Sequence, residues 1–202
     1  MIDWIKNISK NYPEFWKNYL ESFHEKPTRI VSLSIEATGS NPSKDYILSI
    51  GAISIVDNRL LIEDSFEVNI LQNLPDSDEA LSNNFSLAST RPKITENAGI
   101  ERFVNYLSNA IIVGHRINFD IDIINAALHK LDCGKLKNEI FDIEAMYRKH
   151  KELVEYKNIS LDDLSEEFKI PKSDRISSIE DAYTIALIFI KLKNKLGLFQ
   201  TN

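Results

Sequence analysis

Acidic side chains at the ends of predicted secondary-structure elements are the residues of this chain best placed for chemistry. Glu36 lies at the end of Ile30–Gly39, where apolar and polar residues alternate as in a strand with one buried face. Asp120 and Asp181 each fall at the start of an apolar helical pattern, where the helix dipole favours a negative charge. Each carboxylate alone could be an ordinary solvated or helix-start charge. Carboxylates are also the hard oxygen ligands that Mg²⁺ and Mn²⁺ prefer.

The elements that would position these carboxylates follow from the apolar pattern along the chain. Three strands are predicted first, followed by helices that alternate with two shorter strands, which indicates an α/β domain with a mixed five-stranded sheet flanked by helices. The predicted strands are 29–37, 46–55, 60–70, 110–114 and 139–141. Helices are predicted from Thr95, from a cap at Asn118, over 143–151, from a cap at Ser160, and from Ser177 or Ser178. The polar stretch 71–93 predicts a long loop.

The N-terminal residues predict a separate helical extension over 1–27, which divides the chain from a domain at 28–202. Apolar and aromatic residues recur there at spacings of three or four, and Pro13 should break the pattern into two helices. Two interpretations stay open. The helices either pack on the surface of the domain or dock a partner protein or a second copy of the chain.

Composition limits the classes of function. The 202 residues carry a formal net charge of −6, which argues against a broad basic surface for nucleic acid but not against a metal-dependent nuclease. The single cysteine, Cys133, excludes an internal disulfide and is compatible with a reducing compartment. There is no signal-peptide pattern and no apolar run near ~18 residues, so no membrane span is indicated and we expect a cytoplasmic protein.

Three separated stretches place the acidic residues in recognisable motifs. They are Ser34-Ile35-Glu36-Ala37-Thr38-Gly39, Val113-Gly114-His115-Arg116-Ile117-Asn118-Phe119-Asp120 and Asp174-Arg175-Ile176-Ser177-Ser178-Ile179-Glu180-Asp181-Ala182. In order and spacing, these stretches resemble the motifs of the DEDD 3′-5′ exonucleases. The likeness is greatest to the DEDDh, DnaQ-like group that includes the proofreading epsilon subunit of bacterial DNA polymerase III. It covers roughly residues 29–195 and implies a ribonuclease H-like exonuclease fold.

The resemblance implies a particular chemistry and two departures from it. The family hydrolyses a terminal phosphodiester with two Mg²⁺ or Mn²⁺ ions, held by carboxylates at the places of Glu36, Asp120 and Asp181. The family's metal-bridging Asp is replaced here by Ser34, and its general-base His by Ile176. Loss of a positioned general base typically costs about 10²–10⁴-fold in rate. Three carboxylates without the bridge suit one cation better than two.

The sequence therefore favours an impaired exonuclease-like protein that still binds a nucleic-acid 3′ end or phosphate. Arg116 and Arg175 would bring positive charge to the site, because guanidinium groups match phosphate geometry. One alternative is a slow but active divalent-metal-dependent 3′-5′ exonuclease on DNA or RNA. Another is a protein-interaction module that uses the helices of residues 1–27.

Overall fold

A computed structural model describes residues 11–72, 92–154, 158–171 and 177–198. These residues form one mixed sheet of six strands in the order β4-β3-β2-β1-β5-β6, with β1 in an interior position. The strands are β1 (Ile30–Ala37), β2 (Ile47–Val56), β3 (Arg59–Leu71), β4 (Lys93–Thr95), β5 (Ile111–Gly114) and β6 (Ile140–Asp142). Antiparallel pairing joins β1 to β2 and β2 to β3, whereas β5 is parallel to both β1 and β6.

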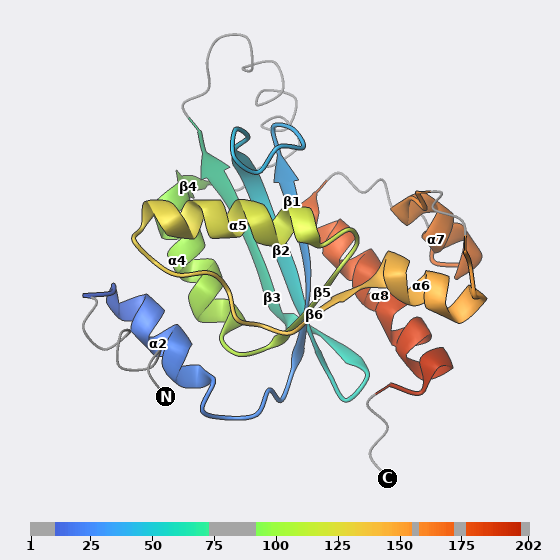
Figure 1. The fold of residues 1–202 in the computed structure, drawn as a ribbon. Coiled ribbons are helices and arrows are strands. Elements are labelled where there is room, and N and C mark those ends of the chain that lie inside the picture. The colour runs from blue at the N-terminus through green and yellow to red at the C-terminus, as the bar shows by residue number, and fades with distance from the viewer. Residues whose placement is uncertain (1–10, 73–91, 155–157, 172–176, 199–202) are drawn as a thin grey trace.

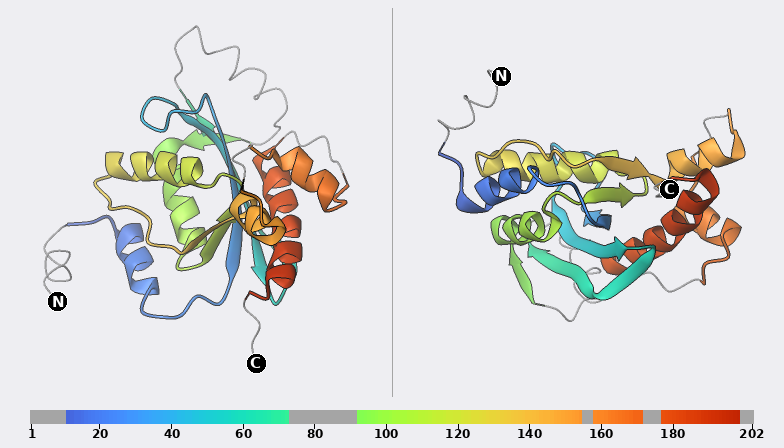
Figure 2. Two further views of the ribbon diagram at one scale, coloured as in Figure 1. Left: turned by 45° about the vertical axis from the view of Figure 1, so that its right-hand side comes forward. Right: turned by 90° about the horizontal axis from the view of Figure 1, so that it is seen from below.

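Helices cover both faces of this sheet (Figures 1 and 2). One hydrophobic core lies between the sheet and α2 (Glu14–Ser22), α4 (Glu96–Leu107) and α5 (Asn118–Lys130). A second core lies on the other face, against α6 (Ile143–Lys151), α7 (Leu161–Glu167) and α8 (Ser178–Leu196). The α/β architecture with a mixed sheet is therefore confirmed.

Alternation along β1 assigns its residues to these two cores. Val31 and Leu33 are fully buried in the core beneath α2, α4 and α5. The intervening residues face α8, and the hydroxyl of Ser32 donates a 2.7 Å hydrogen bond to the carbonyl of Ala182. Because side chains alternate along a strand, Ser34 and Glu36 lie on this same α8 face.

Two details of the predicted elements were wrong. The sheet has six strands in the described residues, not five, because β4 at the end of the stretch expected to be loop pairs in parallel with β3. Three residues are too few to show an alternating pattern. Asn118 is the first residue of α5 and not its cap. Asp142 accepts a hydrogen bond from the Ile117 N–H instead.

The apolar face of α2 is used inside the molecule. Phe15, Trp16 and Tyr19 are buried in the core with α4 and α5, and the Tyr19 hydroxyl donates to Asn138 Oδ1 at 2.7 Å. The helix begins directly after Pro13, as its ring geometry favours, while residues 1–10 of the expected extension lie outside the described part. The helix α2 therefore packs on the domain, and its buried aromatic side chains are not available to bind a partner protein.

Among the described residues, no helix is long and apolar enough to cross a bilayer.

Removing the Trp16 side chain should reveal how far α2 contributes to the stability of the domain. Trp16 is 1% exposed, so Trp16→Ala should lower the free energy of unfolding by about 3–5 kcal/mol. Urea unfolding followed by far-UV circular dichroism measures this. Lys17→Ala, on the exposed side of the same helix, should change stability by less than about 0.5 kcal/mol. A Trp16→Ala effect as small as the control would show that α2 is only loosely attached.

Candidate active site

The start of α8 lies directly on the β1–β2 pair, and a glycine makes this approach possible. Gly51 on β2 pairs with Ser34 on β1. A side chain at Gly51 would overlap the backbone of Ser178 and Ile179 at the first turn of α8. The helix is thereby seated against both strands, and its first turn brings Asp181 to the strand end that carries Glu36.

A hydroxyl pair links the same three elements at Glu36. Ser49 Oγ on β2 lies 3.2 Å from Glu36 Oε2 and 2.8 Å from Ser178 Oγ on α8. Because a serine hydroxyl has one hydrogen, donating it to the ionised carboxylate requires Ser178 to donate to Ser49 in turn. The carboxylate of Glu36 is therefore held by Ser49 on β2, whose hydroxyl is in turn oriented by Ser178 on α8.

The environment of Glu36 favours its protonated form. Burial is the main cause and raises the pKa of Glu36 to about 7. The hydrogen bond from Ser49 opposes this rise, while the negative charges of Asp181 and Glu67 add to it. The family-like carboxylate on β1 is thus poised to titrate near neutral pH.

Asp120 has a still less favourable setting for charge. It is 8% exposed in the first turn of α5, and burial raises its pKa well above the usual aspartate range. Asp142 and then Asp181 raise it further through charge repulsion. Because Asp181 raises the pKa of both Glu36 and Asp120, the structure brings the three predicted carboxylates into one electrostatic neighbourhood.

Asp142 positions two helices at the site, although the sequence assigned no role to this residue. Its Oδ1 accepts the backbone N–H groups of Glu144 and Ala145, which caps α6. Its Oδ2 accepts the Ile117 N–H at 3.0 Å, just before α5 begins. One carboxylate therefore connects two helix starts, and it fixes the first turn of α5 that carries Asp120. A sequence signal for this cap exists: an aspartate ends a short apolar run and directly precedes a helical pattern.

Glu144 is the second residue that the sequence analysis missed. It accepts hydrogen bonds from Arg116 Nε at 3.0 Å, Arg148 Nη2 at 2.8 Å and the Ile159 N–H at 3.2 Å. Burial favours a higher pKa for Glu144, but the bonds from Arg148, Arg116 and Ile159 outweigh burial and lower the pKa. Nearby, His115 Nε2 lies 2.8 Å from the Ile159 carbonyl oxygen. Within the second motif, His115 therefore contacts the segment before α7 directly, whereas Arg116 is connected to that segment through Glu144.

The described part of the chain includes two of the four remaining predicted site residues. Ser34 is 9% exposed on the α8 face of β1. Arg116 has a left-handed backbone (φ 53°) and a half-exposed side chain paired with Glu144. Arg175 and Ile176 lie outside the described residues.

The donor set does not fit a pair of divalent cations. Ser34 contributes a neutral hydroxyl where a bridging carboxylate would be needed. Within the described ranges, no three His, Cys, Asp or Glu side chains lie close enough to hold a metal ion. Neighbouring carboxylates also raise the pKa values of Glu36 and Asp120. Among the described residues, no cationic side chain offsets this negative charge.

Comparison with known proteins agrees with this arrangement of motifs. The RNase_T family model, described as "Exonuclease", matches residues 31–189, which is well over half of the chain. The chain belongs to the DnaQ-like 3′-5′ exonuclease family. It is 30% identical over 174 residues to the DNA polymerase III subunit epsilon of Buchnera aphidicola subsp. Acyrthosiphon pisum, covering 80% of this chain and 71% of that protein.

Other relatives are much longer than this exonuclease-family chain. It is 30% identical to the PolC-type DNA polymerase III of Caldanaerobacter subterraneus subsp. tengcongensis over 82% of its own length but only 12% of the polymerase. Among solved structures, exonuclease I of E. coli bound to a dA16 oligonucleotide superposes with a TM-score of 0.68 at 13% identity, over 84% of this chain and 42% of that one. This likeness confirms the ribonuclease H-like fold.

The pKa of Glu36 should be visible in the pH dependence of stability. Since the folded-state pKa of Glu36, about 7, exceeds the ordinary value of 4.5, the contribution of Glu36 to stability is fully present below pH 4.5 and is lost as the pH rises through 7. Glu36→Gln stays neutral, so above pH 7 it should be more stable than the wild type by about 1–2 kcal/mol, after allowance for solvent screening.

Urea unfolding at pH 5 and pH 8 tests this expectation. Glu101→Gln, an exposed carboxylate on α4, serves as the control and should leave the pH dependence unchanged. If Glu36→Gln loses as much stability between the two pH values as the wild type does, Glu36 is ionised throughout.

Proposed function

We propose that this family member binds the 3′ end of a DNA or RNA strand and is impaired in its hydrolysis. The observation that carries the proposal is Ser34, a neutral residue on the same face of β1 as Glu36 and opposite Gly51. A carboxylate at this place would bridge two cations in the family reaction, and a serine hydroxyl does not supply that charge. The proposal takes residues 28–202 as the exonuclease-like domain and 1–27 as its extension, in a cytoplasmic protein.

The third motif supports impairment from the sequence. Ile176 stands where the family has a histidine, and an aliphatic side chain cannot take a proton from an attacking water. Loss of such a base costs about 10²–10⁴-fold. The missing carboxylate at position 34 and the missing base at position 176 affect the same step, so their costs need not multiply.

Binding of a strand end would use the remaining polar groups. Arg116 is half exposed beside the second motif, and a phosphate would share its guanidinium with Glu144. Arg175 is the second proposed phosphate ligand. Structures of exonuclease I with dT13 and dA16 oligonucleotides show that a protein of this fold accommodates a single strand, which favours the same class of ligand here.

A slow exonuclease is the second candidate. It is favoured by the shared electrostatic neighbourhood of Glu36, Asp120 and Asp181, because drawing these carboxylates together around a single Mg²⁺ or Mn²⁺ would offset their mutual repulsion. A relative from Bacillus subtilis, 27% identical over 171 residues, is the 3′-5′ exonuclease DinG.

Trimming of 5′-labelled single-stranded DNA and RNA in Mn²⁺ distinguishes the two candidates. We expect at most trace trimming by the wild type. Restoring both lost groups with Ser34→Asp and Ile176→His should increase the rate at least about 10²-fold, the lower end of the contribution of a general base. Robust wild-type trimming that is lost in Glu36→Ala would establish the slow exonuclease instead. No gain in the restored variant would show that the site has changed beyond these two positions.

Phosphate recognition by the two arginines should appear in the salt dependence of binding. Arg116→Ala with Arg175→Ala removes two phosphate contacts, so the slope of log affinity against log salt should fall by about 1.4 for a single strand. Fluorescence anisotropy of a 5′-labelled oligonucleotide in EDTA measures the slope. The control pair Arg59→Ala and Arg102→Ala removes exposed charges on β3 and α4. Equal slopes for both pairs would mean that the arginines act only through net charge.

A further inference from the structure

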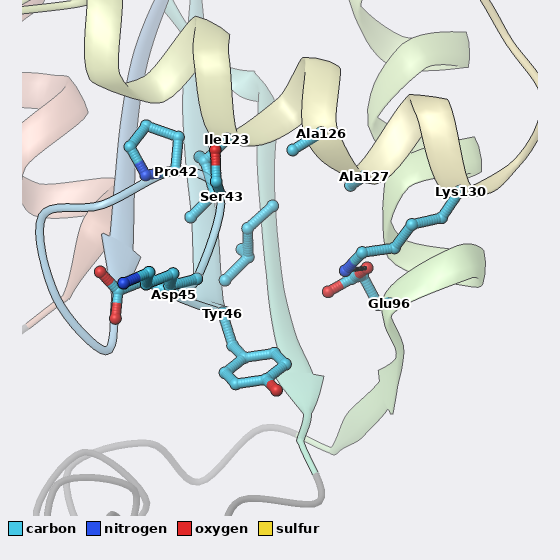
Figure 3. A pocket seen from close by; sticks show the side chains of 11 residues that line it. Pro42, Ser43, Asp45, Tyr46, Glu96, Ile123, Ala126, Ala127 and Lys130 are labelled. Atoms are coloured by element: carbon cyan, nitrogen blue, oxygen red, sulfur yellow. Dashed lines mark hydrogen bonds and ion pairs between the residues drawn. The ribbon is translucent and has the colours of Figure 1, made fainter.

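A small cavity lies beside the β1–β2 loop, away from the contact between α8 and the sheet. It has a volume of about 170 Å³ and opens between this loop, the middle of α5 and the start of α4 (Figure 3). Buried apolar side chains from β2 and α5 form its floor, and polar side chains with one tyrosine surround its mouth. The lining residues include Ile47, Ile123, Ala126, Ala127, Tyr46, Glu96 and Lys130.

The loop that borders the cavity is held by its own hydrogen bonds. Asp45 accepts bonds from the Thr38 hydroxyl at 3.0 Å and from the Asn41 N–H at 2.6 Å. The backbone of Tyr46 is bonded to Thr38 in both directions, through its N–H and its carbonyl oxygen. Gly39 leaves room for this arrangement, because a side chain at position 39 would displace the Asp45 carboxylate. The Tyr46 ring is thus presented by a preorganised loop, which reduces the entropic cost of binding.

The opposite wall carries a donor and an acceptor side by side. Lys130 Nζ lies 2.7 Å from Glu96 Oε1, and Gln72 Nε2 donates to Glu96 Oε2 at 3.2 Å. Lys130 also lies 6.0 Å from the centre of the Tyr46 ring. A lysine ammonium has three hydrogens and a carboxylate accepts about four bonds, so this contact exhausts neither group.

We propose that this cavity binds one nucleobase of a single strand. A cavity of about 150 Å³ holds a benzene ring, so 170 Å³ accepts a single base but not a whole nucleotide. The base would stack on Tyr46 over the apolar floor. Its edge, which combines hydrogen-bond donors and acceptors, would meet the carboxylate of Glu96 and the ammonium of Lys130.

The cavity lies some way from the carboxylates, so it would bind a nucleotide inside the strand and not its 3′ end. This inference rests on the proposed strand binding. Asp120 and Ala127 are seven residues apart on α5, or about 10 Å along the helix axis. At about 3.4 Å per stacked nucleotide, the base in the cavity would lie a few nucleotides from the 3′ end held near Glu36 and Asp120.

An abasic scan tests the inference with the full chain. Single-stranded 12-mers in EDTA, each with one base removed at successive positions from the 3′ end, are titrated by fluorescence anisotropy. We expect one internal position at which base removal weakens wild-type binding roughly 5- to 150-fold, the range for loss of one stacked base. Tyr46→Ala should weaken binding of the intact strand by a similar factor and abolish the effect of removing that base.

A second variant and a control guard against indirect effects. Ala126→Leu fills the cavity from a partly exposed position and should abolish the same positional effect without removing any polar group. Tyr183→Ala removes a comparably exposed tyrosine from α8 and should bind like the wild type. Circular dichroism melting checks that each variant is folded.

The outcomes separate this inference from the proposed function. Strand binding without an internal position that depends on Tyr46 and Ala126 overturns the cavity proposal and leaves strand-end binding intact. If no strand binds, the proposed function fails, and saturation-transfer NMR with free uridine and cytidine then tests the cavity directly. A signal that is lost in Ala126→Leu would support a base site, and no signal from the wild type would overturn it.

Discussion

The close contact between the first turn of α8 and the β1–β2 pair is the constraint on which the site depends. It requires Gly51, because a side chain there would overlap the backbone of Ser178 and Ile179. It is reinforced by the bond from Ser32 to the Ala182 carbonyl, 150 residues away in sequence. Through this contact, a carboxylate from the last helix comes beside the carboxylate of the first strand.

Concentrating acidic groups in this way raises the energetic cost of their ionisation. Burial acts first on both Glu36 and Asp120, and the charge of Asp181 adds to each. Two features nevertheless hold the carboxylates in place. Ser49 bonds to Glu36 and is itself bonded to Ser178, and Asp142 links the starts of α5 and α6 beside Asp120. With serine at position 34, this chain carries one negative charge fewer in this crowded region than it would with a carboxylate there, which lessens the repulsion among the acidic groups.

A second polar cluster stabilises the segment around the second motif. Glu144 binds Arg116, Arg148 and the backbone of Ile159, while His115 contacts the carbonyl of that same residue. A residue predicted from the sequence to bind phosphate therefore also takes part in the contacts that join α6 to the segment before α7. Arg116 illustrates the point, since the charge that could meet a phosphate already neutralises Glu144.

The sequence by itself determined the fold class, the identity and order of the three motifs, and most strands and helices, because period-two and helical patterns depend on local burial. It also located the helix cap at Ser160, whose signal is local, and the structure shows that this cap is a capping box with Asp163. Only the tertiary structure decided that α2 is part of the core, that β4 adds a sixth strand, and that Asp142 replaces Asn118 at the start of α5. The electrostatic coupling of Glu36, Asp120 and Asp181 was likewise decided by the fold. These features depend on contacts between residues tens to more than a hundred positions apart, which leave no pattern along the chain.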